Sequence, residues 1–153
     1  MKRLFRPLAA GLGLALLVAQ LWRPARNESP PGGPNDLAAK YAVPPPVQAL
    51  LQRACYDCHS NRTRYPWYAE VQPVRWWLDH HISEGKRHLN FSEFGAYPEK
   101  RAGKKLDEII DEVEGHTMPL ASYTWIHRDA RLSAADAKLL TDWADGLRAE
   151  IAP

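Results

Sequence analysis

Four stretches of the chain carry apolar residues at the spacing of an α-helix, and none alternates with the period of two that a strand requires. The predicted helices cover about residues 47–54, 73–86 and 99–114, and the last one begins at Ser133. The pattern therefore predicts an all-α fold. The expected buried faces are Val47, Leu50, Leu51 and Ala54; Val74, Trp77, Leu78, His81 and Ile82; Leu106, Ile109, Ile110 and Val113; and Leu139, Leu140, Trp143 and Leu147.

Residues typical of helix ends support these boundaries. Gly115 follows the third helix and suits a C-terminal cap. Ser133 and Asp136 are spaced like a capping box at the start of the last helix, and Ser92 is a further candidate cap. Residues 60–73 and 116–132 show no sustained periodicity, so we expect loops there. A long loop inside a compact domain is usually functional.

The N-terminal residues have the layout of an export signal. Lys2, Arg3 and Arg6 form a basic head, and the run 7–22 is apolar except for Gln20. A cleavage site needs small residues at −3 and −1, but cleavage after Ala19 or Ala25 would put Leu17 or Arg23 at −3. We therefore expect an uncleaved membrane anchor over residues 1–26 rather than a cleaved signal peptide, with the domain on the periplasmic side of the bacterial inner membrane.

Residues 27–45 differ in composition from the rest of the chain. Asn27 to Asp36 is rich in proline, glycine and polar residues, and Val43 is followed by three prolines. Such a sequence has little to bury. The pattern predicts a linker over 27–45 that joins the anchor to a single domain over 46–153.

The charge balance gives no support to nucleic-acid binding. The formal net charge of the chain is +2, but five of the 20 basic residues lie before residue 27. From Leu37 onward there are 15 basic and 16 acidic residues. A nucleic-acid-binding domain needs a clear excess of basic residues. No phosphate-binding loop, Ser-His-Asp set or paired carboxylates favours an enzyme.

Cys55-Tyr56-Asp57-Cys58-His59 has the C-x-x-C-H spacing that attaches a c-type haem. On a helix, Cys55 and Cys58 share one face and can reach the two vinyl groups of one porphyrin. His59 then supplies the proximal iron ligand. A thioredoxin-like dithiol would need a βαβ pattern, and a zinc site would need two further ligands at close spacing; His80 and His81 lack that spacing. Both cysteines of the chain belong to this motif, which leaves none for a disulfide.

Met118 is the candidate sixth ligand of the iron. It is the only methionine besides the initiator and is followed by Pro119 in the predicted loop 116–132. A thioether paired with histidine raises the reduction potential relative to two histidines; as an alternative, Met118 would only fill space in the core. His81 and His116 are the competing ligands. We expect His80, His88 and His127 at the surface or around the haem. For Arg62, Arg64 and Arg75, two roles are open: they bind the haem propionates, or they are solvated.

Several segments together resemble the haem-binding domain family of bacterial monohaem c-type proteins. They are Cys55 to Tyr68, His88 to Ser92, Met118-Pro119, Tyr123, His127 and Ala130 to Ser133. The resemblance extends from about Pro46 to the C-terminus. It implies Cys55 and Cys58 as attachment sites, His59 as proximal ligand and Met118 as distal ligand of one covalent haem c. Leu120 departs from the family, whose members often have a second proline there.

These observations predict a small cytochrome c-like protein that transfers single electrons between redox partner proteins. Residues 1–26 would hold it at the inner membrane. An electron carrier of this kind is not an enzyme. The alternative is a haem-based sensor or a peroxidase-like enzyme with a displaceable sixth ligand, in which His81 or His116 would serve as the distal base.

Overall fold

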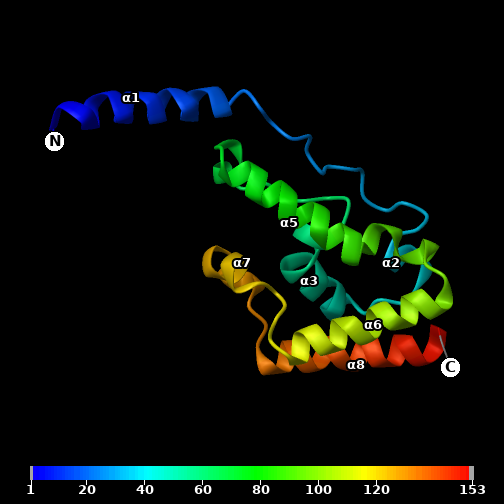
Figure 1. Cartoon of the computed structure of the whole chain (residues 1–153). Helices are drawn as coiled ribbons and strands as arrows, with labels where there is room; N and C mark the ends of the chain where they lie inside the picture. The colour runs from blue at the N-terminus through cyan, green and yellow to red at the C-terminus, as the bar shows by residue number, and fades with distance from the viewer. Residues whose placement is uncertain (1, 152–153) are drawn as a thin grey trace.

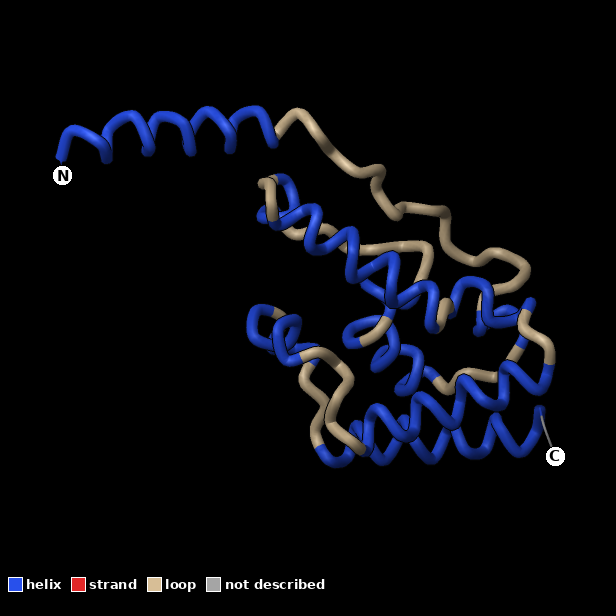
Figure 2. Tube along the Cα trace, in the orientation of Figure 1, coloured by secondary structure: helices blue, strands red, loops and turns tan. Residues whose placement is uncertain are grey.

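The computed structural model describes residues 2–151, and in this range the chain folds into eight α-helices and three short 3-10 helices without a β-strand (Figures 1 and 2). One isolated antiparallel bridge joins Glu28 to Arg62. The all-α prediction is confirmed. The elements are α1 Lys2–Ala19, α2 Leu37–Lys40, α3 Pro45–Ala54, α4 Tyr56–His59, η1 Trp67–Glu70, α5 Val74–His88, η2 Phe91–Ala96, α6 Glu99–Glu114, α7 Ala121–Ile126, η3 Arg128–Ala130 and α8 Ala134–Ile151.

The core lies between the antiparallel pair α6 and α8 and the shorter elements α2, α3 and η2 that pack near it (Figure 1). The four apolar residues predicted for α3 are all buried. In α6, Leu106, Ile109 and Val113 are buried as predicted, and Ile110 is half-buried against the same core. The two largest fully buried side chains are Phe91 and Phe94 of η2.

In α8 the capping prediction is confirmed, but the predicted buried face is partly wrong. Ser133 Oγ accepts a hydrogen bond from the Asp136 amide at 3.1 Å, and Asp136 accepts from the Ser133 amide at 3.0 Å. Leu139 is 40% exposed. The buried residues are Leu140, Ala144, Leu147 and Ile151, because small Ala144 lets this slightly rotated face approach α6.

The predicted apolar face of α5 does not lie in a packed core. Of its members only Ile82 is buried, whereas Val74 and Trp77 are exposed. The helix itself runs from Val74 to His88, close to its predicted range. The helix packs on α4 and η1, and its His80, His81 and Glu84 side chains border a cavity, so helical periodicity alone does not reveal what covers this face.

Short helices interrupt both predicted loops, and the cap of η2 differs from the prediction. Residues 60–73 contain η1, and residues 116–132 contain α7 and η3. These elements are too short for apolar periodicity to reveal them. Asn90, not Ser92, caps η2, because its side chain accepts from the Ser92 amide.

Residues 27–45 pack on the domain along part of their length, although their composition predicts a linker. Asn27 Nδ2 donates to the Ser60 carbonyl at 2.8 Å, and Lys86 Nζ donates to Asn27 Oδ1 at 2.6 Å. Leu37 is fully buried in the core. Backbone hydrogen bonds, such as that from the Ser29 amide to the Asn61 carbonyl, also hold the segment. Together with single polar side chains and one leucine, they leave no periodic signal in the sequence.

Helix α1 extends away from the rest of the chain (Figure 1). Its leucines and Val18 from residue 8 onward are at least half exposed. Within residues 2–151, no helix combines the length and the apolar character needed to cross a membrane.

Candidate functional site

A cavity of about 560 Å³ lies between α3–α4, α5, α6 and the segment 118–123. Ligand pockets of proteins typically span roughly 300–1,000 Å³. The four residues predicted from sequence to hold a cofactor all line this one cavity: Cys55, Cys58, His59 and Met118. Much of the remaining wall is apolar, from Leu51, Ala54, Leu89, Phe91, Ile109, Val113, Leu120, Leu132 and Leu140.

The two cysteines reach the cavity from the junction of α3 and α4, where Cys55 joins the helices and Cys58 lies in α4. Helix α3 ends at Ala54, and the amides of Cys58 and His59 both donate to the Cys55 carbonyl, at 3.2 and 3.0 Å. This turn places residues three apart on one face. Burial raises the pKa of Cys55 to about 12 and that of Cys58 to about 11. A dithiol redox site needs a thiolate, so these thiols do not suit that chemistry.

His59 is held with one ring nitrogen committed and the other free for a metal. Its Nδ1 lies 3.1 Å from the Leu89 carbonyl oxygen. A carbonyl only accepts, so Nδ1 carries the proton and Nε2 keeps its lone pair. A ligating histidine is usually oriented in this way. Burial lowers the pKa of His59 despite the opposing backbone hydrogen bonds, which favours the neutral imidazole that a metal binds.

The segment 89–92 packs against the C-x-x-C-H turn and hydrogen-bonds to it. Leu89 binds His59, and the Phe91 ring stacks on Tyr56 with ring centres 5.2 Å apart. Asn90 Nδ2 donates to Asn61 Oδ1 at 2.9 Å, and Ser92 Oγ accepts from the Asn61 amide at 3.0 Å. The His-Leu-Asn-Phe-Ser stretch singled out in the sequence therefore supports the turn that carries both cysteines and His59.

Asp57 is the residue of this site whose role the sequence did not reveal. It is buried, and its carboxylate accepts hydrogen bonds from the Arg64 amide and guanidinium at 3.1–3.2 Å. Tyr123 Oη donates to Asp57 Oδ2 at 2.7 Å. Burial and this hydrogen bond raise the pKa of Tyr123, so the phenol stays protonated and keeps donating. Only the position of Asp57 inside the motif could have drawn attention to it.

Through Tyr123, the C-x-x-C-H turn is tied to the segment that carries Met118. Tyr123 stacks on His127 with ring centres 4.4 Å apart, and His127 Nε2 lies 2.7 Å from Tyr68 Oη. Met118 itself is half-buried, and its amide donates to the Glu112 carbonyl at 3.1 Å. The chain thus fixes Met118 from α6 on one side and from α7 on the other.

The other histidines differ in whether they line the cavity. His81 lines the cavity, with Nδ1 2.8 Å from the Trp77 carbonyl, and His80 and His88 line it from more exposed positions on the same helix. His116 is exposed and does not line the cavity. Its backbone has a positive φ of 55° just after α6, where the chain turns toward Met118. Of the two competing ligands, only His81 borders the site.

The three arginines that were candidates either to bind haem propionates or to be solvated do not line the cavity, and two of them have protein partners. Arg64 binds Asp57, and buried Arg75 donates to the Pro24 carbonyl at 2.6 Å. Arg62 is exposed, and none of the three lines the cavity. The basic side chain on the cavity wall is Lys105 of α6, which pairs with Glu108.

The donor set and the wall fit a haem. One free imidazole nitrogen, one thioether and two thiols on adjacent turns surround an apolar space. Zinc would need a closer cluster, and in residues 2–151 no three His, Cys, Asp or Glu side chains are grouped so as to hold a metal ion.

Gly85 of α5 packs directly against the C-x-x-C-H turn, and we expect Gly85→Ala to displace it. An added Cβ would lie 2.8 Å from the Cys58 carbonyl oxygen. Such overpacking costs about 1–3 kcal/mol of unfolding free energy, so both the denaturation midpoint and the yield of haem-loaded protein should fall. Gly146→Ala in α8 is the control, because nothing lies within 4 Å of its added Cβ and it should stabilise by about 0.5–1 kcal/mol. Equal behaviour of the two variants would contradict the close packing.

Comparison with known proteins agrees with the geometry. The sequence model of one family, described as the haem-binding domain, matches residues 14–146. No curated protein matches the chain, and no solved structure matches it either. The matched range covers most of the chain, including all of α2 to α7 and the residues that line the cavity. The protein belongs to the haem-binding domain family.

Proposed function

We propose that the protein is a monohaem c-type cytochrome that transfers single electrons to and from redox partner proteins. The observation that carries the proposal is that the Cys55, Cys58 and His59 side chains of one turn and Met118, which lies much later in the sequence, border one largely apolar cavity. A haem bound there supplies an iron that alternates between the ferric and ferrous states. The chain supplies attachment, iron ligands and a controlled environment.

Each residue then has a distinct task. Cys55 and Cys58 would form thioether bonds to the ring, and His59 would bind the iron through Nε2 while the Leu89 carbonyl holds Nδ1. Met118 would supply its sulfur as the other protein ligand. The Asp57–Tyr123 hydrogen bond keeps the two walls at a fixed separation. A fixed pair of ligands suits electron transfer, because neither ligand has to move when the iron changes charge.

We further propose that the N-terminal segment exports the chain and is retained as a membrane anchor, with the haem domain on the periplasmic side. Its sequence has the layout of an export signal without a suitable cleavage site. Its exposed leucines have no protein partner within the described residues, so an apolar surrounding outside the chain would stabilise them.

A haem-based sensor or peroxidase-like enzyme is the second candidate, and His81 is the observation that favours it. With Nδ1 committed to the Trp77 carbonyl, His81 keeps Nε2 available on the cavity wall. If Met118 were displaced, this nitrogen could act as a replacement ligand or as a base toward a bound peroxide.

The attachment proposal predicts that haem survives denaturation of the protein. Haem staining on a denaturing gel should be positive for the wild type, because thioether bonds are covalent. The double variant Cys55→Ala/Cys58→Ala should lose the stain, and each single variant should keep at most one thioether. The matched control is Gln52→Ala, an exposed position of α3 outside the cavity wall that leaves both thiols in place. A stained double variant would contradict covalent attachment through these cysteines.

The ligand proposal predicts that Met118 controls access to the iron. Met118→Ala should remove the weak near-infrared band of a methionine–ferric bond and allow carbon monoxide to bind the reduced protein. Met118→His should keep six ligands but lower the reduction potential, because imidazole favours the ferric state more than a thioether does. His116→Ala is the control and should change neither property. If the wild type binds carbon monoxide readily, or if His81→Ala rather than Met118→Ala opens the iron, the sensor or peroxidase proposal gains.

The location proposal predicts that the protein fractionates with membranes and keeps its N-terminus. Carbonate washing should leave it in the membrane fraction, and a protease added to spheroplasts should digest the haem domain. A soluble periplasmic protein whose mature chain starts near residue 26 would show instead that the segment is a cleaved signal.

A further inference from the structure

Five of the six tryptophans of the chain are exposed. Contacts link the segments that carry them: Trp76 hydrogen-bonds the Trp22 carbonyl, η1 packs on α5, and Tyr68 of η1 contacts His127 just after α7. Trp67 is 81% exposed, Trp22 77% and Trp125 76%, whereas Trp143 is half-buried beside the core. We call Trp22, Trp67, Trp76, Trp77, Trp125 and Ile126 the tryptophan surface. The start of α5 and all of α7 lie at the end of the domain beyond which α1 extends (Figure 1, left).

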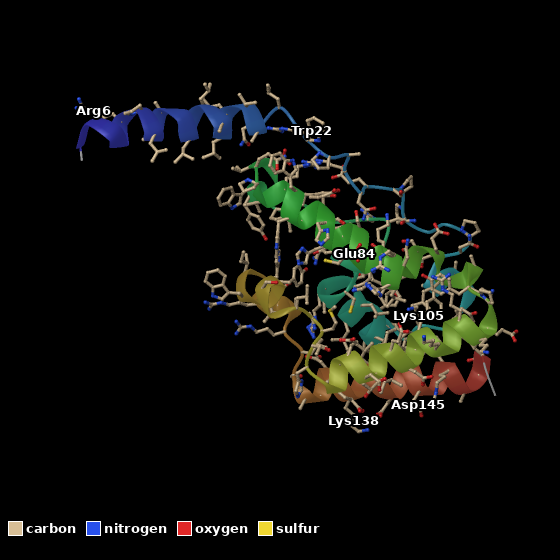
Figure 3. All side chains as sticks on the ribbon, viewed as in Figure 1. Arg6, Trp22, Glu84, Lys105, Lys138 and Asp145 are labelled. Atoms are coloured by element: carbon tan, nitrogen blue, oxygen red, sulfur yellow. The ribbon has the colours of Figure 1, made fainter. Side chains whose placement is uncertain are left out.

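The end of α1 is fastened to this surface by hydrogen bonds. The Trp22 carbonyl accepts from Trp76 Nε1 at 2.9 Å and from Gln72 Nε2 at 2.8 Å. The Gln72 amide in turn donates to Gln20 Oε1 at 2.9 Å. Figure 3 shows Trp22 where the chain leaves α1 and meets the first turn of α5. The segment that directly follows α1 is therefore held against the start of α5 by specific contacts.

The composition of the surface favours a lipid interface over a protein partner. Indole rings combine a large apolar body with one N–H donor and are enriched where a bilayer meets water. The surface continues into α1, whose exposed side chains from Leu8 to Val18 are almost entirely apolar. Arg23 and Arg26 lie just past Trp22 and pair with Glu70, and Arg26 also pairs with Glu28, so the positive charges at this junction are partly compensated.

We propose that the tryptophan surface rests on the membrane interface and holds the haem domain in one orientation. The proposal rests on the retained anchor argued above, and adds a second, independent lipid contact. The surface neighbours residues that line the cavity, because the Trp77 ring lies 4.1 Å from that of His81 on α5 and Trp125 belongs to the same short helix as Tyr123. The cavity is then held beside the bilayer rather than at the end of a free tether.

Vesicle binding of the full chain separates the two lipid contacts. The probe is phosphatidylcholine vesicles, which carry no net charge, and binding is measured by co-sedimentation. Leu12→Glu/Leu16→Glu removes the contribution of α1, and Trp67→Ser/Trp125→Ser is then added to that background. Neither indole donates a hydrogen bond to another part of the described chain, so the fold should persist, which haem content and circular dichroism check. Leu139→Ser on α8 is the control for loss of an exposed apolar side chain.

In the glutamate background we expect some vesicle binding to remain. Adding Trp67→Ser/Trp125→Ser should weaken this residual binding by about tenfold or more, given the apolar area removed. Adding Leu139→Ser instead should leave it unchanged. The absence of residual binding, or equal effects of the tryptophan pair and Leu139→Ser, would overturn the tryptophan surface. The anchor has its own readout: if Leu12→Glu/Leu16→Glu binds vesicles as tightly as the wild type, α1 is not the anchor, whatever the tryptophans do.

Discussion

The carboxylate of Asp57 is the interaction on which the site depends. It is buried inside the C-x-x-C-H turn and is compensated by Arg64 on one side and Tyr123 on the other. A buried carboxylate without partners would cost several kcal/mol, so Arg64 and Tyr123 both stabilise the turn, and the Tyr123 hydrogen bond couples it to α7. This hydrogen-bonded pair joins the wall that carries Cys55, Cys58 and His59 to the wall that carries Met118, which are separated by about sixty residues of sequence.

The remainder of the domain supports these two walls. The α6–α8 pair supplies most of the apolar core and one side of the cavity, and Glu112 of α6 accepts from the Met118 amide. The segment 89–92 supports the opposite wall through Leu89 and His59. Helix α5 contributes little to the core but covers the cavity, with Gly85 packed against Cys58. A large part of the interior of this small domain therefore forms or supports the walls of the cavity, as expected of a haem-binding domain.

The sequence predicts the elements with strong periodicity and the residues with recognisable chemistry. Helix α6, the face of α3 and the Ser133 cap follow from spacing alone, and the four predicted cofactor residues come together in one cavity. The prediction that the apolar face of α5 is buried is wrong, because periodicity reveals an apolar stripe but not what covers it. Asp57 and the true partners of Arg64 and Arg75 depend on contacts between distant segments, which no local pattern encodes. The packing of residues 27–45 was hidden for the same reason.

The central claim is that the imidazole of His59 and the sulfur of Met118 bind one iron from opposite walls of the cavity. X-ray absorption at the iron edge of the purified full chain tests it most directly, because the fine structure distinguishes sulfur from nitrogen ligands. The account predicts an iron with one sulfur ligand, together with four ring nitrogens and one imidazole nitrogen. An iron surrounded by nitrogen alone, with no sulfur in its first coordination sphere, would contradict it.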